Sequence, residues 1–223
     1  GVFPIVGGAT RGNLAELNAS TGLATGWVAN TNSAVAALEV SGGRVFAGGQ
    51  FTLVNGETRQ SVVELDPADG TVLPFSCAPA GLVRSLAYAN NTLFVGGFYS
   101  SMNGSPPGNL AALNATTGAV RPDSPNANST VNGMILHDQR LYVAGAFTAV
   151  NGNTPRGRFA VYGYCVETPW YADVDEDGQG DPGNSVLACE APEGFVGNGD
   201  DCNDADAEVG APLTWYFDAD EDG

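Results

Sequence analysis

The sequence lacks lysine, and all 8 basic residues among its 223 are arginine. It has one histidine and two methionines, and no run of about 18 apolar residues. Because binding to phosphate needs clusters of Lys or Arg, the shortage of basic residues argues against nucleic acid as a partner. The missing apolar run argues against a membrane-spanning segment.

The four cysteines, Cys77, Cys165, Cys189 and Cys202, form no CxxC pair, which argues against a zinc ribbon. Disulfides formed in an oxidising compartment fit better and predict a secreted or cell-surface protein. A bond between Cys189 and Cys202 would close a 14-residue loop and stabilise the fold by about 3 kcal/mol. Two alternatives stay open for Cys165: it pairs with Cys77, or it bonds to a residue beyond Gly223.

Negative charge is concentrated in the last quarter of the chain. Residues 166–223 carry 17 of the 25 acidic residues and no basic one, whereas residues 1–165 carry 8 acidic residues and 8 arginines. Repulsion among so many carboxylates opposes compaction unless cations neutralise them. The sequence therefore predicts a boundary near residue 165 and divalent cations as partners of the second part.

The first part repeats with a period of 48 residues. The aligned positions include glycines, aromatic residues and Asn-Gly pairs: Gly49, Gly97 and Gly145; Phe51, Tyr99 and Phe147; Asn55-Gly56, Asn103-Gly104 and Asn151-Gly152. A fixed period of this size is typical of solenoids, propellers and arrays. Gly1 aligns with Gly49, so we expect the sequence to begin partway through a unit.

One full unit predicts four antiparallel strands, at residues 34–40, 44–49, 60–65 and 71–75, with a loop at 52–59. Four strands over about 45 residues are the content of one propeller blade. We expect an all-β fold: a β-propeller-like array of four-stranded 48-residue blades, forming a partial, truncated ring. The expected units are about 1–30 (partial), 31–78, 79–126 and 127–164 (partial), the last with strands at 131–136, 140–147 and 158–162.

The motifs of these units, such as Leu93-Phe94-Val95-Gly96-Gly97 followed by Asn109-Leu110-Ala111-Ala112-Leu113-Asn114, resemble the delta-60-type β-propeller repeats of large secreted bacterial proteins. The resemblance covers residues 1 to about 162. The resemblance implies a β-propeller fold but implies little about function, because one fold can have many functions.

Alternating carboxylates follow the repeats. Asp173, Asp175, Asp177, Gln179 and Asp181 stand at every second position, with Gly178 where the chain must turn sharply. Alternate oxygen ligands converge when a chain wraps around a hard cation, as in the first half of a calcium loop. Asn184 stands where an EF-hand has its bidentate Glu, so we expect a helix-free calcium loop.

A second acidic cluster supplies Asp201, Asn203, Asp204 and Asp206 as candidate ligands. The first run then restarts, and the matching carboxylates are Asp218, Asp220 and Asp222. We therefore expect an acidic metal-binding repeat over 165–212 and the start of a second copy over 213–223.

This acidic unit resembles the MopE-type metal-binding repeat and the thrombospondin type 3 calcium repeat. The first resemblance covers residues 169 to about 212 and suggests copper. Copper favours His, Cys and Met, whereas the acidic region offers carboxylates and contains no His or Met. We therefore expect Ca²⁺, with copper as the alternative.

The single histidine, His137, falls between two predicted strands, and its counterparts in the other units are Ala89 and Ser41. This argues against a catalytic site shared by the units, and no Gly-x-Ser-x-Gly motif accompanies it. We expect a non-enzymatic structural or adhesive protein with a Ca²⁺-stabilised acidic stalk and a surface glycan or protein as ligand. The alternatives are a metal-scavenging protein, or a hydrolase or lyase whose site lies outside these residues.

Overall fold

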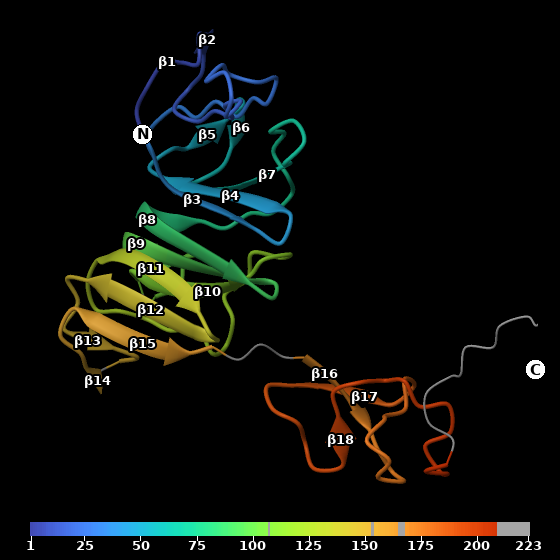
Figure 1. Ribbon diagram of the computed structural model, residues 1–223. Coiled ribbons are helices and arrows are strands. Elements are labelled where there is room, and N and C mark those ends of the chain that lie inside the picture. Colours follow the sequence, from blue (N-terminus) through green and yellow to red (C-terminus); the bar gives the residue numbers. More distant parts are fainter. Residues whose placement is uncertain (107, 153, 165–167, 209–223) are drawn as a thin grey trace, which may run out of the picture. The chain divides into compact units, whose positions relative to one another are not determined.

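The computed structural model describes residues 1–106, 108–152, 154–164 and 168–208, and every regular element within them is a strand (Figure 1). The all-β prediction is confirmed. The chain divides into two compact units, Gly1–Tyr164 and Cys165–Gly223. No helix in the described part of the chain is long and apolar enough to cross a membrane.

Three antiparallel, three-stranded sheets follow one another in the first unit. They consist of β3 (Val35–Ser41), β4 (Arg44–Gly49) and β7 (Val62–Leu65); β8 (Pro79–Ala89), β9 (Thr92–Met102) and β10 (Leu110–Asn114); and β11 (Val131–His137), β12 (Arg140–Gly145) and β15 (Phe159–Gly163). In each sheet the second strand lies in the centre, as expected for a meander.

The predicted fourth strand of each blade is reduced to an isolated bridge, Leu65 with Val72 and Leu113 with Val120. The predicted loops instead contain short hairpins. These are β1 (Ile5–Val6) with β2 (Ala9–Thr10), β5 (Leu53–Val54) with β6 (Glu57–Thr58), and β13 (Ala149–Val150) with β14 (Thr154–Pro155). Asn55 and Gly56 form the tip of one hairpin with φ values of 50° and 86°, as a two-residue turn of this type requires.

The aligned glycines lie where neighbouring backbones approach each other. A Cβ atom on Gly97 would lie 2.1 Å from the carbonyl oxygen of Leu82, and one on Gly49 would lie 2.1 Å from that of Ala34. The ladder opposite these glycines shifts register, which marks a β-bulge. This close approach explains the aligned glycines, because a side chain at these positions would force the two strands apart.

Adjacent sheets of the first unit pack on each other through their first and second strands, β3 and β4 on β8, and β8 and β9 on β11 (Figure 1). Phe46 is fully buried between the first two sheets. Its ring packs edge-on against Phe75, with ring centroids 5.4 Å apart, and lies 5.6 Å from the ring of Tyr88. Apolar burial between successive sheets therefore holds the array together.

Cys77 is a buried, free thiol in the same core, so the alternative that pairs it with Cys165 is wrong. Cys165 lies outside the described residues. The space around Cys77 is filled by apolar side chains such as Phe75 and Val83, which explains why this cysteine behaves as a small core residue.

We expect Cys77 to resist alkylation by iodoacetamide at pH 8 in the native chain and to react once the chain is unfolded. Burial raises the pKa of the Cys77 thiol to about 12, so the reactive thiolate is scarce, and the surrounding core also blocks access. Mass spectrometry of peptides after a short pulse, with and without urea, measures both states. Equal labelling rates in the two states would contradict the buried position.

The second unit contains a small antiparallel sheet in the order β17-β16-β18, formed by β16 (Thr168–Ala172), β17 (Ser185–Ala188) and β18 (Phe195–Val196). The sequence pattern does not predict these strands. Trp170 on β16 donates its indole N–H to the carbonyl oxygen of Ala188, at 3.1 Å. A Cβ atom on Gly199 would lie 2.7 Å from the ring of Tyr171, so the chain after β18 lies tightly against β16.

Candidate metal centre

Two acidic loops of the second unit are held together by backbone hydrogen bonds. The first loop follows β16 and the second follows β18. The N–H of Asp201 donates to the carbonyl oxygen of Gly180, at 3.1 Å. The N–H of Val174 donates to Oδ1 of Asp204, at 2.7 Å. The two loops, about 30 residues apart in sequence, therefore form one structure.

Carboxylates within the first loop also fix its backbone. Oδ1 of Asp175 accepts the N–H of Asp177 at 3.2 Å, and Oδ1 of Asp177 accepts the N–H of Gln179 at 2.7 Å. Oδ2 of Asp173 accepts the N–H of Gly178 at 3.1 Å, where φ is +88°. The first two bonds are Asx-type turns, which Asp favours because its short side chain reaches the backbone two residues on; the third closes the loop over five residues. The alternating sequence pattern thus produces a tightly turned loop.

The second loop also contains an Asx-type turn, because Oδ1 of Asp201 accepts the N–H of Asn203 at 2.8 Å. Asp201 is only 5% exposed, which is unusual for a carboxylate. A buried carboxylate normally has a cationic partner or a full set of hydrogen bonds.

Five carboxylates converge between the loops in two groups, and the ligand oxygens of each group lie within 4.8 Å of one another. The groups are Asp173, Asp175 and Asp177, and Asp175, Asp201 and Asp204. Asp175 belongs to both groups. The two acidic clusters that the sequence suggested therefore meet around one shared residue.

Three carboxylate oxygens in these groups are buried and have no hydrogen-bond partner: Oδ1 of Asp173, Oδ2 of Asp175 and Oδ2 of Asp201. The other oxygen of each of these side chains accepts a backbone N–H. Loss of hydration raises the pKa of Asp175, the N–H of Asp177 lowers it, and the negative charges of Asp177 and Asp201 raise it further. Such an arrangement suits a hard divalent cation, which bonds to several carboxylate oxygens at once.

The remaining candidate ligands belong to neither carboxylate group. Oδ1 of Asp181 accepts the N–H of Gly183 at 2.7 Å, and Oδ1 of Asp206 accepts that of Glu208 at 3.3 Å; neither residue belongs to the two carboxylate groups. The side chain of Gln179 contacts Asp177, at 3.4 Å between Nε2 and Oδ2. Asn203 is exposed. Asp218, Asp220 and Asp222 lie outside the described residues, as does the predicted second copy over 213–223.

Cys202, next to the buried Asp201, is an exposed free thiol. The predicted disulfide between Cys189 and Cys202 is therefore wrong. In this structure the second acidic loop is held by the hydrogen bonds of Asp201 and Asp204 to the first loop, which sequence spacing of the cysteines could not reveal.

The single histidine is not part of this centre. His137 ends β11, its side chain is 71% exposed, and Nε2 lies 3.1 Å from Oδ2 of the neighbouring Asp138. Since both groups are open to solvent, this contact is a weak surface pair.

Comparison with known proteins addresses the repeats of the first unit. A family described as a domain of unknown function (DUF5122), a β-propeller, matches residues 43–72. No curated protein matches the sequence. A solved structure of the computationally designed Ika4 protein aligns with 60% of this chain and 92% of its own, at 15% identity and a TM-score of 0.28, too low to define a shared topology. The family match supports β-propeller repeats in the first unit, whose described elements are all strands.

Proposed function

We propose that the second unit binds Ca²⁺ between its two acidic loops, and that the ion holds these loops in one compact structure. The observation that carries the proposal is the set of three buried carboxylate oxygens without hydrogen-bond partners. A buried carboxylate oxygen without a partner is unfavourable, because it has lost its hydration and gained no hydrogen bond in exchange. A cation among them would remove this cost and the mutual repulsion of the five carboxylates.

Calcium fits these donors better than copper does. The two groups consist only of aspartates, and Ca²⁺ takes six to eight oxygen ligands in flexible geometry. Copper prefers imidazole and sulfur ligands. The remaining positions around the ion would be filled by backbone carbonyls or water.

We further propose that the chain is a non-enzymatic, secreted or cell-surface protein with a structural or adhesive role. The first unit would present a surface to a glycan or protein ligand, and the acidic unit would act as its Ca²⁺-ordered stalk. Support comes from the division into a neutral repeat unit and an acidic unit. A glycan array probed with the full chain tests the adhesive part, and activity screening against glycosidic and ester substrates tests the enzymatic alternative.

We expect Ca²⁺ to protect the second unit from proteolysis and to raise its unfolding temperature. A ligand at a hundred times its Kd stabilises the bound state by about 2.7 kcal/mol. Limited proteolysis of the full chain in saturating CaCl₂ or in EDTA measures the effect, with cleavage sites mapped by mass spectrometry. Cleavage in the first unit serves as the internal control.

Isothermal titration of the chelator-treated chain with Ca²⁺, Mg²⁺ and Cu²⁺ identifies the metal. Preferential binding of Cu²⁺ would favour the scavenging alternative. Identical cleavage rates over residues 168–208 with Ca²⁺ and with EDTA would refute an ion-ordered unit.

A further inference from the structure

The middle sheet of the first unit is longer than the sheets before and after it. Its strands β8 and β9 have 11 residues each, whereas β3 and β11 have 7 and β4 and β12 have 6. The ladders between the first two strands of the other sheets end at Gly49 and Gly145, but the ladder of the middle sheet continues past the aligned Gly97. The middle sheet therefore has an extension, formed by residues 79–82 and 98–102, that its neighbours lack.

A change in the repeat accompanies this extension. In the first sheet, Oδ1 of Asn32 accepts the backbone N–H groups of Thr52 and Leu53, at 2.9 and 3.0 Å. Asn128 makes the same pair of bonds in the third sheet. Ala80 stands at the aligned position of the middle unit and has no side-chain acceptor. Backbone pairing between β8 and β9 therefore replaces these side-chain bonds, since the backbone groups need partners.

The extension carries a large aromatic side chain on its surface. Phe98 is 64% exposed and pairs directly with Leu82, so the two side chains share one face of the sheet. The aligned residues of the other units are Gln50 and Ala146. The blade fold itself therefore does not require an aromatic ring at this position.

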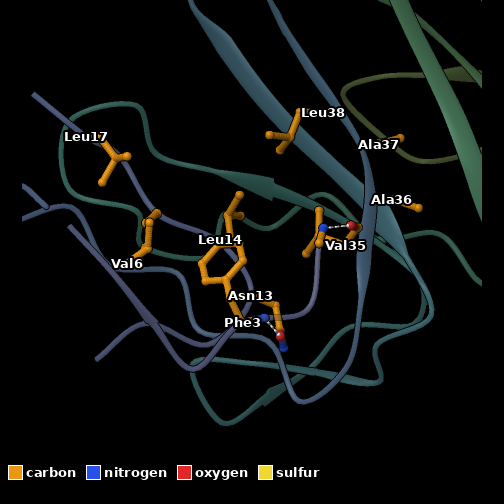
Figure 2. A pocket seen from close by; sticks show the side chains of 11 residues that line it. Phe3, Val6, Asn13, Leu14, Leu17, Val35, Ala36, Ala37 and Leu38 are labelled. Atoms are coloured by element: carbon orange, nitrogen blue, oxygen red, sulfur yellow. Dashed lines mark hydrogen bonds between the residues drawn. The ribbon is translucent and has the colours of Figure 1, made fainter. Parts of the chain in front are cut away.

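An arginine without a partner lies next to this pair. Arg84 is the extra residue of the β-bulge in β8, is exposed, and stands two positions from Leu82, within reach of a long side chain. Within the described residues it forms no hydrogen bond and no ion pair. Its counterparts are Asn132 and Ala36, and Figure 2 shows the short side chain of Ala36 on β3. The free guanidinium is therefore specific to the middle unit.

An exposed amide lies on the neighbouring strand. Asn132 is the extra residue of the bulge in β11, and its side chain has no hydrogen bond within the described residues. The N–H of Met134 donates to Oγ of Ser85 at 2.9 Å, which joins β11 to β8 beside both bulges. The two strands lie side by side in Figure 1. Arg84 and Asn132 therefore lie at the same level of adjacent strands.

We propose that the surface formed by Leu82, Arg84, Phe98 and Asn132, the Phe98 surface, binds a carboxylated sugar of a glycan, of the hexuronate class. The C–H face of the sugar ring packs on the electron-rich face of Phe98. The carboxylate accepts two charge-assisted hydrogen bonds from Arg84, whose planar guanidinium matches it. The amide of Asn132 bonds to a sugar hydroxyl. This inference rests on the proposed adhesive role and adds the class of glycan and the place where it binds.

The combination of groups favours a sugar over an acidic peptide. A hexuronate carries a carboxylate and an apolar C–H face on one rigid ring, so a single residue of the glycan contacts both Arg84 and Phe98. The side chains of Asp and Glu have no flat apolar face. An acidic peptide would therefore use Arg84 and leave Phe98 without a contact.

The test uses the full chain and fluorescein-labelled hexasaccharides of glucuronate, galacturonate and mannuronate, each compared with its carboxyl-reduced, neutral counterpart. Fluorescence anisotropy gives the Kd, and measurement in EDTA excludes bridging of the sugar to the acidic unit by Ca²⁺. We expect at least one uronate to bind in EDTA. Its neutral counterpart should bind at least about tenfold more weakly, because it cannot form the charge-assisted bonds with Arg84.

Two variants carry residues that the other units have at the aligned positions, so the fold should accept them. Phe98→Ala should weaken the uronate and its neutral counterpart alike, by at least about tenfold. Arg84→Asn should weaken the uronate alone and so bring the two sugars to similar affinities. Phe159→Ala and Arg140→Asn, at exposed residues of the third sheet, are the matched controls and should leave both affinities unchanged. Circular dichroism checks that each variant is folded.

The outcomes separate this inference from the adhesive role on which it rests. Uronate binding that neither Phe98→Ala nor Arg84→Asn changes would overturn the Phe98 surface as the site. Equal affinities of the parent chain for charged and neutral sugars, or no binding of any uronate, would overturn the ligand class. So would a hexaglutamate peptide that binds as tightly as the best uronate. In each case the adhesive role stands if the glycan array still shows a ligand, and it falls if the array shows none.

Discussion

Asp201→Asn should weaken calcium binding by at least about a hundredfold, about 2.7 kcal/mol, and should leave the metal-free chain as stable as the parent or more stable. The substitution keeps the shape of the side chain and the bond from Asn203 N–H to Oδ1. It removes one negative charge from a group in which Asp175 and Asp204 lie within 4.8 Å. In the metal-free chain the substitution reduces the repulsion between these carboxylates and removes a carboxylate oxygen that has no hydrogen-bond partner. We expect the free energy of unfolding to rise by about 1 kcal/mol or more as a result.

Opposite effects with and without metal separate a ligand from a structural residue. A residue that only supports the loop would lose stability in both states. Isothermal titration gives the affinity, and thermal unfolding in EDTA and in Ca²⁺ gives the two stabilities. Asp200→Asn is the control, since Asp200 is exposed and outside both carboxylate groups. A metal-free Asp201→Asn chain that is clearly less stable than the parent, with unchanged calcium affinity, would show that the residue has a structural role alone.

Gly97→Ala should destabilise the first unit by more than about 3 kcal/mol. The added methyl would lie 2.1 Å from the carbonyl oxygen of Leu82 and 2.9 Å from the Cα atom of Val83. Both contacts are to backbone, so no side-chain rotation relieves them. The strands β8 and β9 must separate at the bulge, and the ladder between them is the longest in the described chain. Urea unfolding followed by far-UV circular dichroism, in excess Ca²⁺, measures the loss.

Gly133→Ala supplies the matched control for Gly97→Ala. Gly133 also lies in a first-unit strand beside a bulge, but a Cβ atom there meets nothing within 4 Å and its φ lies outside the left-handed region. We expect a stability within about 1 kcal/mol of the parent. Equal losses in the two variants would mean that flexibility, and not close backbone approach, explains the aligned glycines.

The repeat made most of the first unit predictable. The sequence predicts the second strand of the complete unit at residues 44–49, where β4 lies, because apolar residues and glycines there are preceded by a turn signal at Gly42-Gly43. The fourth strand was predicted at 71–75 but consists of the single bridge at Val72. Its residues have strand propensity, whereas the pairing depends on how the turn after Leu65 positions the chain, and residue propensity does not encode that.

The candidate site was predictable in composition and not in arrangement. Alternating aspartates identified Asp173, Asp175 and Asp177 as one group, because a tight loop brings alternate residues together. Nothing local to either loop shows that Asp201 and Asp204 join them. That arrangement depends on β16 pairing with β18, and on Gly199 allowing the chain to lie against Tyr171. These are long-range contacts, which a single sequence without an internal repeat at that spacing does not reveal.

One departure from the period shows where these repeats tolerate change. Val54 pairs with Glu57 three positions later, and so does Met102 with Ser105, whereas Val150 pairs with Thr154, four positions later. Yet Val143 on β12 still faces Ala160 on β15, as Ala47 faces Val63. The extra residue in this hairpin therefore does not change which residues pair in the following strands of the sheet. The hairpins at the rims of the blades can therefore change in length while the strands of the sheets keep their register.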